Sequence, residues 1–376
     1  MRIAQVSHNL ECGGSMAMVV FLSAKLTEMG HEIDVVCTDR ATGSAHEQLW
    51  LSWLDKRGVS CRFLGRRRGD PGFTTAAKLW RLVQRENYDV VHSHLPMPDA
   101  MTGVARRLVN NRFVHVLTVH NTQEPRSRVL AACASGADVV YCSEAARRRN
   151  PVSGLSSTVI PNGIIQSLYG APRGTHETRW HLGLPNDAIV VIAVGRMCDQ
   201  KNFDAAIDAI AMFKQRVADR DVRFLFCGDG QEKDRLEERS RKLGLAGIVQ
   251  FLGNRTDIPA LLSASNVFLS TSIYEGMPLT VLEALSAGLP CILSSIDEHY
   301  EIARAMPGCV FAPSNSPDAI ASALDAVTSD PISANVLRRA RSPFLEKFSI
   351  DNCAASYLRL YELLVQPRLS PATTVT

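Results

Sequence analysis

Residues 266–295 read NVFLSTSIYEGMPLTVLEALSAGLPCILSS, and this stretch predicts a strand, a loop, a helix and a second strand. The short apolar runs at its two ends have the length and composition of strands. Pro278 suits the first position of the helix between them, where a missing N–H costs nothing, and Gly288 with Pro290 ends that helix. Because parallel strands need a crossover of this kind, the stretch favours an α/β fold.

The same alternation of strand and helix continues along the whole chain. Helical segments, for example 15–29 and 74–87, separate short runs of Val, Ile and Leu. The strands that we expect span residues 2–7, 31–37, 89–94, 113–120, 137–143 and 157–162, and then 188–195, 222–228, 247–253, 266–271, 290–295 and 308–312. Such apolar strands predict parallel sheets with helices on both faces, and ligands bind beyond the carboxyl ends of their strands.

The length of the chain, 376 residues, favours two domains rather than one. We place the first at residues 1–166, completed by a C-terminal helix around 355–366, and the second at 167–354. We expect residues 367–376 to form a disordered tail.

The formal net charge of +3 is unevenly spread. Residues 1–166 carry 20 Lys and Arg against 14 Asp and Glu, whereas residues 167–376 carry 21 against 24. Basic runs such as Arg66–Arg68 are typical of solvated faces, but they also suit anionic lipid or phosphate. Aromatic residues are not interleaved with them as a nucleic-acid surface requires, so we do not expect a nucleic-acid partner.

Any contact with a membrane would be peripheral. The apolar stretch 16–24 is too short to span a bilayer and lacks the charge pattern of a signal peptide. The helical segment 74–87 carries Leu79, Trp80 and Val83, which we expect to be buried in the domain. Charge alone would then attract the first domain to an anionic surface.

The ten cysteines are scattered without a Cys-x-x-Cys pair, and several lie in apolar runs. This pattern indicates reduced, buried thiols rather than a disulfide framework or a zinc site. We therefore expect a cytoplasmic protein, with any membrane contact on the inner face of the cytoplasmic membrane.

Two cations flank the loop after the strand at 188–195. Arg196 and Lys201 stand just before a helix that begins near Phe203. A helix N-terminus favours an anion, and Arg with Lys can neutralise a diphosphate without a metal, although surface charge is the alternative. The next strand ends in Cys-Gly-Asp-Gly at 227–230, where glycine allows either close approach of a ligand or a simple tight turn.

The stretch 274–284 places two glutamates eight positions apart. Glu275 lies in the loop at the carboxyl end of a strand, and Glu283 lies roughly 7.5 Å further along the helix axis. On the helix, Glu283 faces away from Val281 and Leu285, which pack on the sheet. The alternative to a functional pair is a loop acid with a solvated helix acid.

These segments together resemble a known family. The order G-R-x4-K-N at 195–202, F-C-G-D-G-x-E at 226–232 and E-x7-E at Glu275 and Glu283 is similar to that of the retaining glycosyltransferase family 4. The resemblance runs from the first strand to the final YLRLYELL. It implies the GT-B fold, in which two doubly wound Rossmann-like parallel-sheet domains face each other across a cleft, and an enzyme of the bacterial polysaccharide or lipopolysaccharide type.

The resemblance also implies roles for residues of the second domain. Arg196 and Lys201 correspond to the pair that holds the pyrophosphate of a nucleotide-sugar. Glu275 addresses the sugar ring, and Glu283 the ribose hydroxyls. The further residues expected at the donor are Gly276, Met277, Pro278, Leu279 and Thr280, through their backbone, and Asn254 and Arg255, beside the base. Pro278 replaces a second glycine found in many relatives, which loosens any inference about the sugar.

In the first domain, Gly13 and Gly14 correspond to a glycine loop that lies against the donor phosphates. They do not form G-x-G-x-x-G, so a dinucleotide-binding dehydrogenase is not supported. His120 corresponds to a histidine near the reacting carbon, with a structural role as the alternative. For His94, a packed or turn histidine is the better interpretation.

We expect no metal and no cofactor. The Asp-x-Asp match at Asp219 and Asp221 precedes a strand and so lies at the amino end of the sheet, opposite the ligand edge. Double displacement needs a carboxylate nucleophile, for which the family offers no agreed candidate. Front-face attack, assisted by the leaving phosphate, is the usual proposal.

The resemblance therefore predicts a retaining, metal-independent hexosyltransferase. It would move a hexose or N-acetylhexosamine from a nucleotide-sugar, for which UDP is the expected nucleotide, to a glycan or a lipid-linked acceptor. One alternative is a sugar-nucleotide epimerase or hydrolase on the same fold, which would turn over the donor without an acceptor. The other is a non-catalytic module that binds a nucleotide-sugar.

Overall fold

The computed structural model describes residues 1–11, 13–67, 69–70, 72–109, 112–123, 136–151, 157–169, 175–217, 220–330 and 332–369. The chain divides into two compact units: unit 1 is Met1–Gly163 with the segment from Ser349 onward, and unit 2 is Ile164–Phe348. The two crossings between the units thus lie at 163/164 and 348/349, where the sequence placed them at 166/167 and 354/355.

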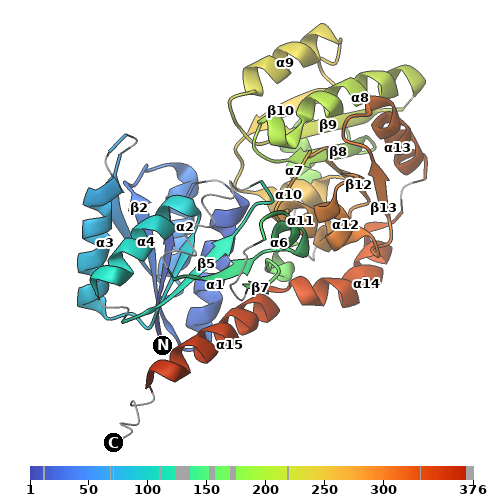
Figure 1. Cartoon of the computed structure of the whole chain (residues 1–376). Helices are drawn as coiled ribbons and strands as arrows, with labels where there is room; N and C mark the ends of the chain where they lie inside the picture. Colours follow the sequence, from blue (N-terminus) through green and yellow to red (C-terminus); the bar gives the residue numbers. More distant parts are fainter. Residues whose placement is uncertain are drawn as a thin grey trace, which may run out of the picture. The chain divides into compact units, whose positions relative to one another are not determined.

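Unit 1 is built on a parallel sheet with the strand order β3-β2-β1-β4-β5-β6-β7 among the described residues (Figure 1). Its strands are β1 (Arg2–Ser7), β2 (Glu32–Asp39), β3 (Ser60–Arg66), β4 (Val90–His94), β5 (Val114–Val119), β6 (Asp138–Tyr141) and β7 (Ser157–Val159). The sequence did not predict β3, because this edge strand is only half-buried and its apolar residues are interrupted by Arg62 and Gly65.

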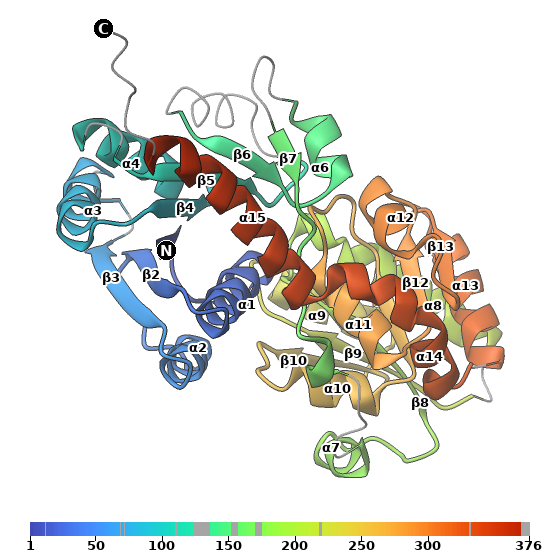
Figure 2. The same cartoon turned by 90° about the horizontal axis from the view of Figure 1, so that it is seen from below.

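Helices cover both faces of this sheet. They are α1 (Gly14–Glu28), α2 (Ala45–Asp55), α3 (Gly72–Glu86), α4 (Pro96–Leu108), α6 (Glu144–Arg149) and α15 (Ile350–Leu369). Helices α3 and α4 pack together on one face, where Leu79 and Val83 are buried as expected but Trp80 is only partly buried. Helix α15 lies across the other face (Figure 2). We expected a disordered tail from residue 367, but α15 continues to Leu369, and residues 370–376 lie outside the described residues.

Side chains of one strand alternate between these two helical layers. On β4, Val91 packs with α3 and α4, whereas His92 bonds to Tyr361 of α15. On β1, Ala4 and Val6 likewise lie in the core beneath α3 and α4. Because of this alternation, buried polar side chains that are neighbours in the sequence of a strand lie on opposite faces of the sheet.

Unit 2 has a second parallel sheet, with the order β10-β9-β8-β11-β12-β13 among the described residues. Its strands are β8 (Ile189–Val194), β9 (Val222–Cys227), β10 (Val249–Gly253), β11 (Val267–Ser270), β12 (Cys291–Ser294) and β13 (Cys309–Ala312). The strand order reverses between β8 and β11. A reversal of this kind is where doubly wound sheets bind ligands, beyond the carboxyl ends of the strands.

The helices of unit 2 are α7 (Thr175–His181), α8 (Phe203–Arg216), α9 (Lys233–Lys242), α10 (Ile258–Ala264), α11 (Leu279–Ala287), α12 (Asp297–Ala303), α13 (Pro317–Ser329) and α14 (Ala334–Leu345). Phe203, Ile207 and Ile210 of α8 share one hydrophobic core with the strands and with α13. In the part of the chain that the structure describes, no helix is long and apolar enough to cross a membrane.

Candidate functional site

Lys201 and Glu275 meet at the carboxyl edge of the sheet in unit 2. Lys201 ends a short 3-10 helix after β8, and Glu275 lies in the loop after β11. Because β8 and β11 are neighbours, these loops lie side by side. Lys201 Nζ is 2.5 Å from Glu275 Oε1, and both side chains are mostly buried. The resemblance assigned the two residues to different parts of a donor, whereas the structure pairs them with each other.

Close backbone packing determines the path of the Lys201 side chain. A Cβ at Gly195 would lie 2.9 Å from Cε of Lys201, so the lysine stem runs directly over this glycine. Gly228, in the loop after β9, has a φ of +142°, and a Cβ there would lie 2.0 Å from the carbonyl oxygen of Gly195. Gly228 thus allows a close contact between two loops, which the sequence did not predict.

Glu275 belongs to a network of hydrogen-bonded polar side chains. Ser272 Oγ donates a hydrogen bond to Glu275 Oε1 at 2.7 Å and lies 3.3 Å from Ser270 Oγ. His299 of α12 places Nε2 3.4 Å from Ser270 Oγ and Nδ1 2.9 Å from the carbonyl oxygen of Ser294. Burial lowers the pKa of His299 to about 4, so its ring is neutral. Sequence reasoning missed His299, although its place just after an expected strand was a usable signal.

Glu283 is buried as well, so the alternative of a solvated helix acid is wrong. Its side chain lies in α11, and only 9% of the residue is exposed. Tyr169 OH donates a hydrogen bond to Glu283 Oε1 at 2.8 Å. Burial raises the pKa of Glu283 to about 7, and the hydrogen bond from Tyr169 opposes that rise. Sequence reasoning missed Tyr169, which lies far from the motif in the chain.

The segment between the two glutamates leads into the N-terminus of α11. We expected Pro278 at the first helical position, but it is the N-cap residue and the helix begins at Leu279. Gly276, Met277, Pro278 and Leu279 are buried, and Thr280 is half-buried. The first N–H groups of a helix have no acceptor within it, which is the property that makes this end suitable for an anion.

Arg196 and Arg255 differ in their surroundings. Arg196 is exposed and forms no hydrogen bond or ion pair with the residues that the structure describes. Arg255 forms two hydrogen bonds with Asp257, at 2.8 and 2.6 Å, and its neighbour Asn254 is exposed. Arg255 thus has a carboxylate partner, whereas Arg196 has none among the described residues.

The Asp-x-Asp segment lies partly outside the described residues, because Asp219 is not among them. Asp221 pairs with Arg223 at 2.7 Å, and its carbonyl oxygen accepts from Ile189 at the amino end of β8. Within the described ranges, no group of three or more His, Cys, Asp or Glu could hold a metal ion.

In unit 1, two exposed glycines follow β1. Gly13 is the N-cap residue of α1, and Gly14 is its first residue. A Cβ at Gly13 would meet no atom within 4 Å. This helix N-terminus is therefore open for close contact with its backbone.

His120 follows β5 at the same edge of the sheet. Its Nε2 lies 2.9 Å from Nδ1 of His94, which ends β4. The two rings stack at 5.2 Å between centroids. His94 is fully buried, in agreement with the interpretation as a packed histidine.

A second polar group lies on the opposite face of β4, toward α4. Ser93 Oγ is 2.9 Å from Asp99 Oδ1 and 3.0 Å from His115 Nε2. The combination of Ser, His and Asp resembles a hydrolase triad in composition, but both Ser93 and Asp99 contact the same ring nitrogen. In a triad they contact different nitrogens. All three side chains are buried, so this group stabilises the interior.

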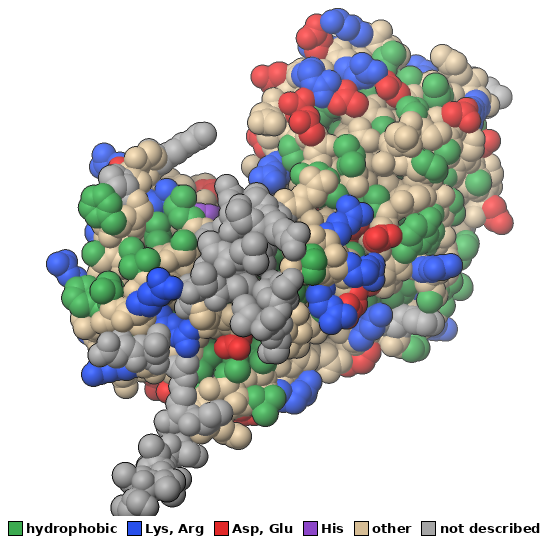
Figure 3. Space-filling model, viewed as in Figure 1, with side chains coloured by type: hydrophobic (Ala, Val, Ile, Leu, Met, Phe, Trp, Pro, Cys, Tyr) green, Lys and Arg blue, Asp and Glu red, His purple; other side chains and the backbone are tan. Residues whose placement is uncertain are grey.

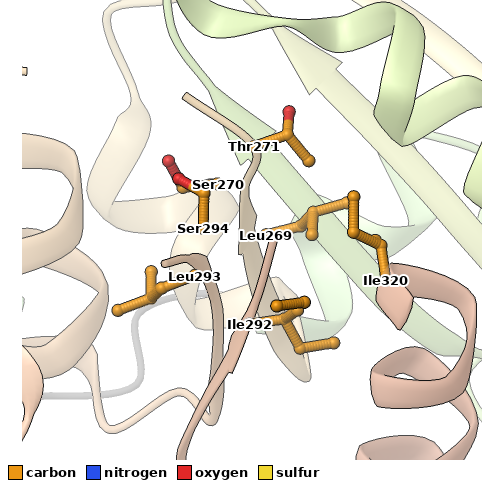
Figure 4. Close-up of a pocket in the computed structure, with 8 residues that line it drawn as sticks. Leu269, Ser270, Thr271, Ile292, Leu293, Ser294 and Ile320 are labelled. Carbon is orange, nitrogen blue, oxygen red and sulfur yellow. The ribbon is translucent and has the colours of Figure 1, made fainter. Parts of the chain in front are cut away.

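A small gap in unit 2 lies between the ends of β11 and β12 and helix α13 (Figure 4). Ser270 and Ser294 have their hydroxyl groups on one side of these strands, and Leu269, Ile292 and Ile320 lie on the other. These three apolar residues belong to the core of unit 2. The gap is an imperfection in core packing and not a ligand site.

Comparison with solved structures defines the class of the fold. HepE of Anabaena, in complex with UDP and glucose, matches with a TM-score of 0.81 at 18% identity, over 96% of this chain and 100% of that one. Sucrose-phosphate synthase of Thermosynechococcus elongatus matches with a TM-score of 0.77 at 21% identity, over 97% of this chain and 99% of that one. The protein thus has the GT-B fold of glycosyltransferases.

Sequence comparison places the chain within that class. The model described as Glycosyltransferase Family 4 matches residues 12–167, and the model described as Glycosyl transferases group 1 matches residues 175–342. An Escherichia coli UDP-Gal:alpha-D-GlcNAc-diphosphoundecaprenol alpha-1,3-galactosyltransferase is 27% identical over 72% of this chain and 74% of its own length. The chain belongs to the family 4 glycosyltransferases, as the motifs predicted.

Proposed function

We propose that this glycosyltransferase moves a hexose or N-acetylhexosamine from a UDP-sugar to a glycan or lipid-linked acceptor, with retention of anomeric configuration and without a metal. The observation that carries the proposal is the pairing of Lys201 with Glu275 at the switch point of the unit 2 sheet. Arg196, which has no ion-pair partner among the described residues, lies in the same loop as Lys201. The similar E. coli enzyme uses UDP-Gal and acts on a diphosphoundecaprenol-linked sugar.

Binding of a diphosphate would rearrange this pair. Lys201 Nζ, now 2.5 Å from Glu275, would turn to the phosphate together with Arg196. Charge builds up on the leaving diphosphate in the transition state, and fixed cations stabilise it there more than in the ground state. Glu275, released from the lysine, would accept hydrogen bonds from hydroxyls of the sugar. Phosphate binding and sugar recognition are thereby linked.

Glu283 suits the ribose. Its pKa of about 7 lets the carboxyl group exist in either protonation state near neutral pH, and Tyr169 fixes one of its oxygens. Two ribose hydroxyls would supply the hydrogen-bond donors that favour its ionised form. Asn254, next to the Arg255–Asp257 pair, would face the base.

A lipid-linked acceptor requires contact with a membrane surface, and unit 1 carries a suitable face. Helix α4 exposes Met97, Val104 and Leu108, and α3 exposes Phe73 near its start. Figure 3 shows hydrophobic side chains beside Lys and Arg on the face that α3 and α4 form. These exposed residues are distinct from Leu79 and Val83, which are buried.

The charges on these two helices are one-sided at the surface. Their acids, Glu86 and Asp99, are both buried in the domain. The exposed charged residues are all basic: Lys78, Arg81, Arg85 and Arg107. Each basic residue near an anionic bilayer contributes about 1 kcal/mol, and the attraction fades within a Debye length of about 8 Å at physiological salt. The face therefore favours reversible, salt-sensitive docking.

Two experiments test the proposal. Calorimetry and turnover with UDP-, GDP- and ADP-sugars, each with and without acceptor, separate a transferase from an epimerase or hydrolase, which would consume the donor alone. A module that only binds would give heat without turnover. Sedimentation with anionic and neutral vesicles, at low and high salt, tests docking. The variant Val104→Glu/Leu108→Glu should stay in the supernatant, and equal recovery of the native protein in all four conditions would exclude docking.

A further inference from the structure

A chain of hydrogen bonds within unit 1 ends at His120. Gln5 of β1 places Oε1 2.7 Å from His94 Nε2, and His94 Nδ1 lies 2.9 Å from His120 Nε2. The chain crosses three neighbouring strands, β1, β4 and β5. At its end, the buried Nδ1 of His120 has no hydrogen-bond partner among the described residues. A buried polar atom without a partner requires an explanation.

Helix α15 fixes the amide that starts the chain. Gln5 Nε2 donates to Tyr361 OH at 3.5 Å, and Tyr361 OH lies 2.6 Å from His92 Nδ1. Burial raises the pKa of Tyr361, so this hydroxyl stays protonated and can donate a hydrogen bond to His92 Nδ1. His92 Nε2 then donates to Thr118 Oγ1 at 2.7 Å. Tyr361 therefore contacts both His92 and the amide nitrogen of Gln5. The contact with the amide nitrogen turns the amide oxygen of Gln5 toward His94.

The direction of each bond follows from this amide. An amide oxygen only accepts, so His94 must carry its hydrogen on Nε2. Burial keeps the pKa of His94 well below its usual value, and the neutral ring has one hydrogen. Its Nδ1 therefore accepts from His120 Nε2–H. Burial also lowers the pKa of His120 to about 4, so His120 is neutral and its Nδ1 carries no hydrogen.

We propose that Gln5 and His94 are positioning residues that hold His120 in the Nε2–H tautomer and so present Nδ1 as a hydrogen-bond acceptor to a sugar hydroxyl. The inference rests on the proposed function, a transferase that uses a nucleotide-sugar, and on the resemblance, in which His120 corresponds to a histidine near the reacting carbon. In the opposite tautomer, Nδ1 would offer a hydrogen instead and would oppose a hydroxyl donor. The chain of hydrogen bonds thus determines that Nδ1 of His120 accepts a hydrogen bond from a sugar hydroxyl and does not donate one to it.

The backbone at this place is also constrained. Leu95, directly after His94, has a φ of +79°, which is unusual for a residue other than glycine. Strain of this kind persists where the surrounding structure fixes it, and it is common at functional sites. Among the described residues, the titratable groups near these hydrogen bonds are His92 on β4, His115 on β5, Cys142 after β6, and Cys353, Tyr357 and Tyr361 on α15.

The tautomer can be measured directly in the full-length protein without any substrate. Two-bond 1H–15N correlation spectra report which ring nitrogen of each histidine carries the hydrogen. We expect the Nε2–H form for His120 in the native protein. In Gln5→Leu, His94 Nε2 loses its acceptor, so both tautomers of His120 should be populated. An Nδ1–H form in the native protein, or an unchanged single form in Gln5→Leu, would overturn the proposal.

Conservative and control variants separate positioning from folding. Gln5→Glu keeps an acceptor at the same place, so it should retain the Nε2–H tautomer. Its carboxylate should raise the pKa of the histidine pair and move the acid limb of the kcat profile upward by about one pH unit or more. Ser93→Ala removes a buried hydroxyl from the other face of β4 and should lower the melting temperature without changing the tautomer of His120.

Turnover distinguishes this proposal from the proposed function. In Gln5→Leu, we expect kcat to fall about tenfold while the KM for the donor changes little. If the native protein shows the expected tautomer but turns over no nucleotide-sugar, the proposed function fails and the hydrogen-bond assignment stands. If turnover is normal and kcat is the same in Gln5→Leu as in the native protein, the positioning role fails.

Discussion

The substitution Gly195→Ala should reduce turnover by moving Lys201. The new Cβ would lie 2.9 Å from Cε of Lys201, 3.1 Å from Cδ and 3.3 Å from Cγ. Carbon atoms pack at about 3.5–4.0 Å, so the lysine stem must shift by roughly 0.5–1 Å. A shift of that size would disturb the 2.5 Å contact between Lys201 Nζ and Glu275.

The expected cost falls on catalysis and not on folding. A displacement of about 1 Å in a positioning group can cost about 100-fold in rate. We therefore expect kcat to fall by about 10- to 100-fold, equivalent to about 1.4–2.7 kcal/mol in the barrier. The atoms that must move belong to a flexible side chain, so the free energy of unfolding should change by less than about 1 kcal/mol.

A double-mutant cycle tests whether the effect passes through Lys201. Steady-state kinetics are measured for Gly195→Ala, Lys201→Met and the double variant, with thermal unfolding as the check on folding. Lys201→Met should lower kcat by about 100-fold or more. If Gly195→Ala acts through the lysine, the double variant will be no slower than Lys201→Met. Additive losses, or native turnover in Gly195→Ala, would refute the reasoning. Gly72→Ala, whose Cβ would meet only Met101 Cε at 3.5 Å, is the matched control.

Further outcomes follow from the other groups of the site. Because burial raises the pKa of Glu283 from 4.5 to about 7, the native fold loses stability as pH rises through this range. Glu283→Gln should therefore have the same melting temperature as the native protein near pH 4 and a higher one above pH 7. The corresponding gain in the free energy of unfolding is up to about 3 kcal/mol. Glu283→Ala should chiefly weaken calorimetric binding of the nucleotide, whereas Glu275→Ala should chiefly lower kcat. Glu275→Gln frees Lys201 and should bind UDP more tightly than the native protein while turning over more slowly; weaker UDP binding would contradict the pairing argument. Turnover should survive EDTA, and a loss restored by Mg²⁺ or Mn²⁺ would refute metal independence.

The sequence was sufficient for the fold because the signals were local and repeated. Apolar strands separated by helices identified both parallel sheets, and the motifs around Lys201 and Glu275 identified the family. Strand β3 was missed because an edge strand needs apolar residues on one face only, and its arginine and glycine interrupt the run. The end of the last helix was placed too early, because a proline near a C-terminus also suits a disordered tail.

The contacts of the candidate site residues could not be predicted from the sequence. Glu283 looked solvated on a helical wheel, since a wheel considers one helix and ignores what packs on its other side. Tyr169 lies 114 residues away in sequence and covers that side. Gln5 was missed because it forms part of no motif and acts through a neighbour, whereas His299 was missed although it follows an expected strand. Contacts between distant segments depend on tertiary packing, which no local pattern encodes.

The pairing of Lys201 with Glu275 would affect which ligand the site binds more tightly. A buried carboxylate that loses its cationic partner loses the compensation of its charge, which costs free energy even where a neutral donor such as Ser272 remains. A phosphate group alone would take the lysine and leave Glu275 in that position. A nucleotide-sugar would take the lysine and supply sugar hydroxyls to Glu275 at the same time. Under the proposed function, the pair would therefore favour the complete donor over its diphosphate fragment, and it would form again when the product diphosphate leaves.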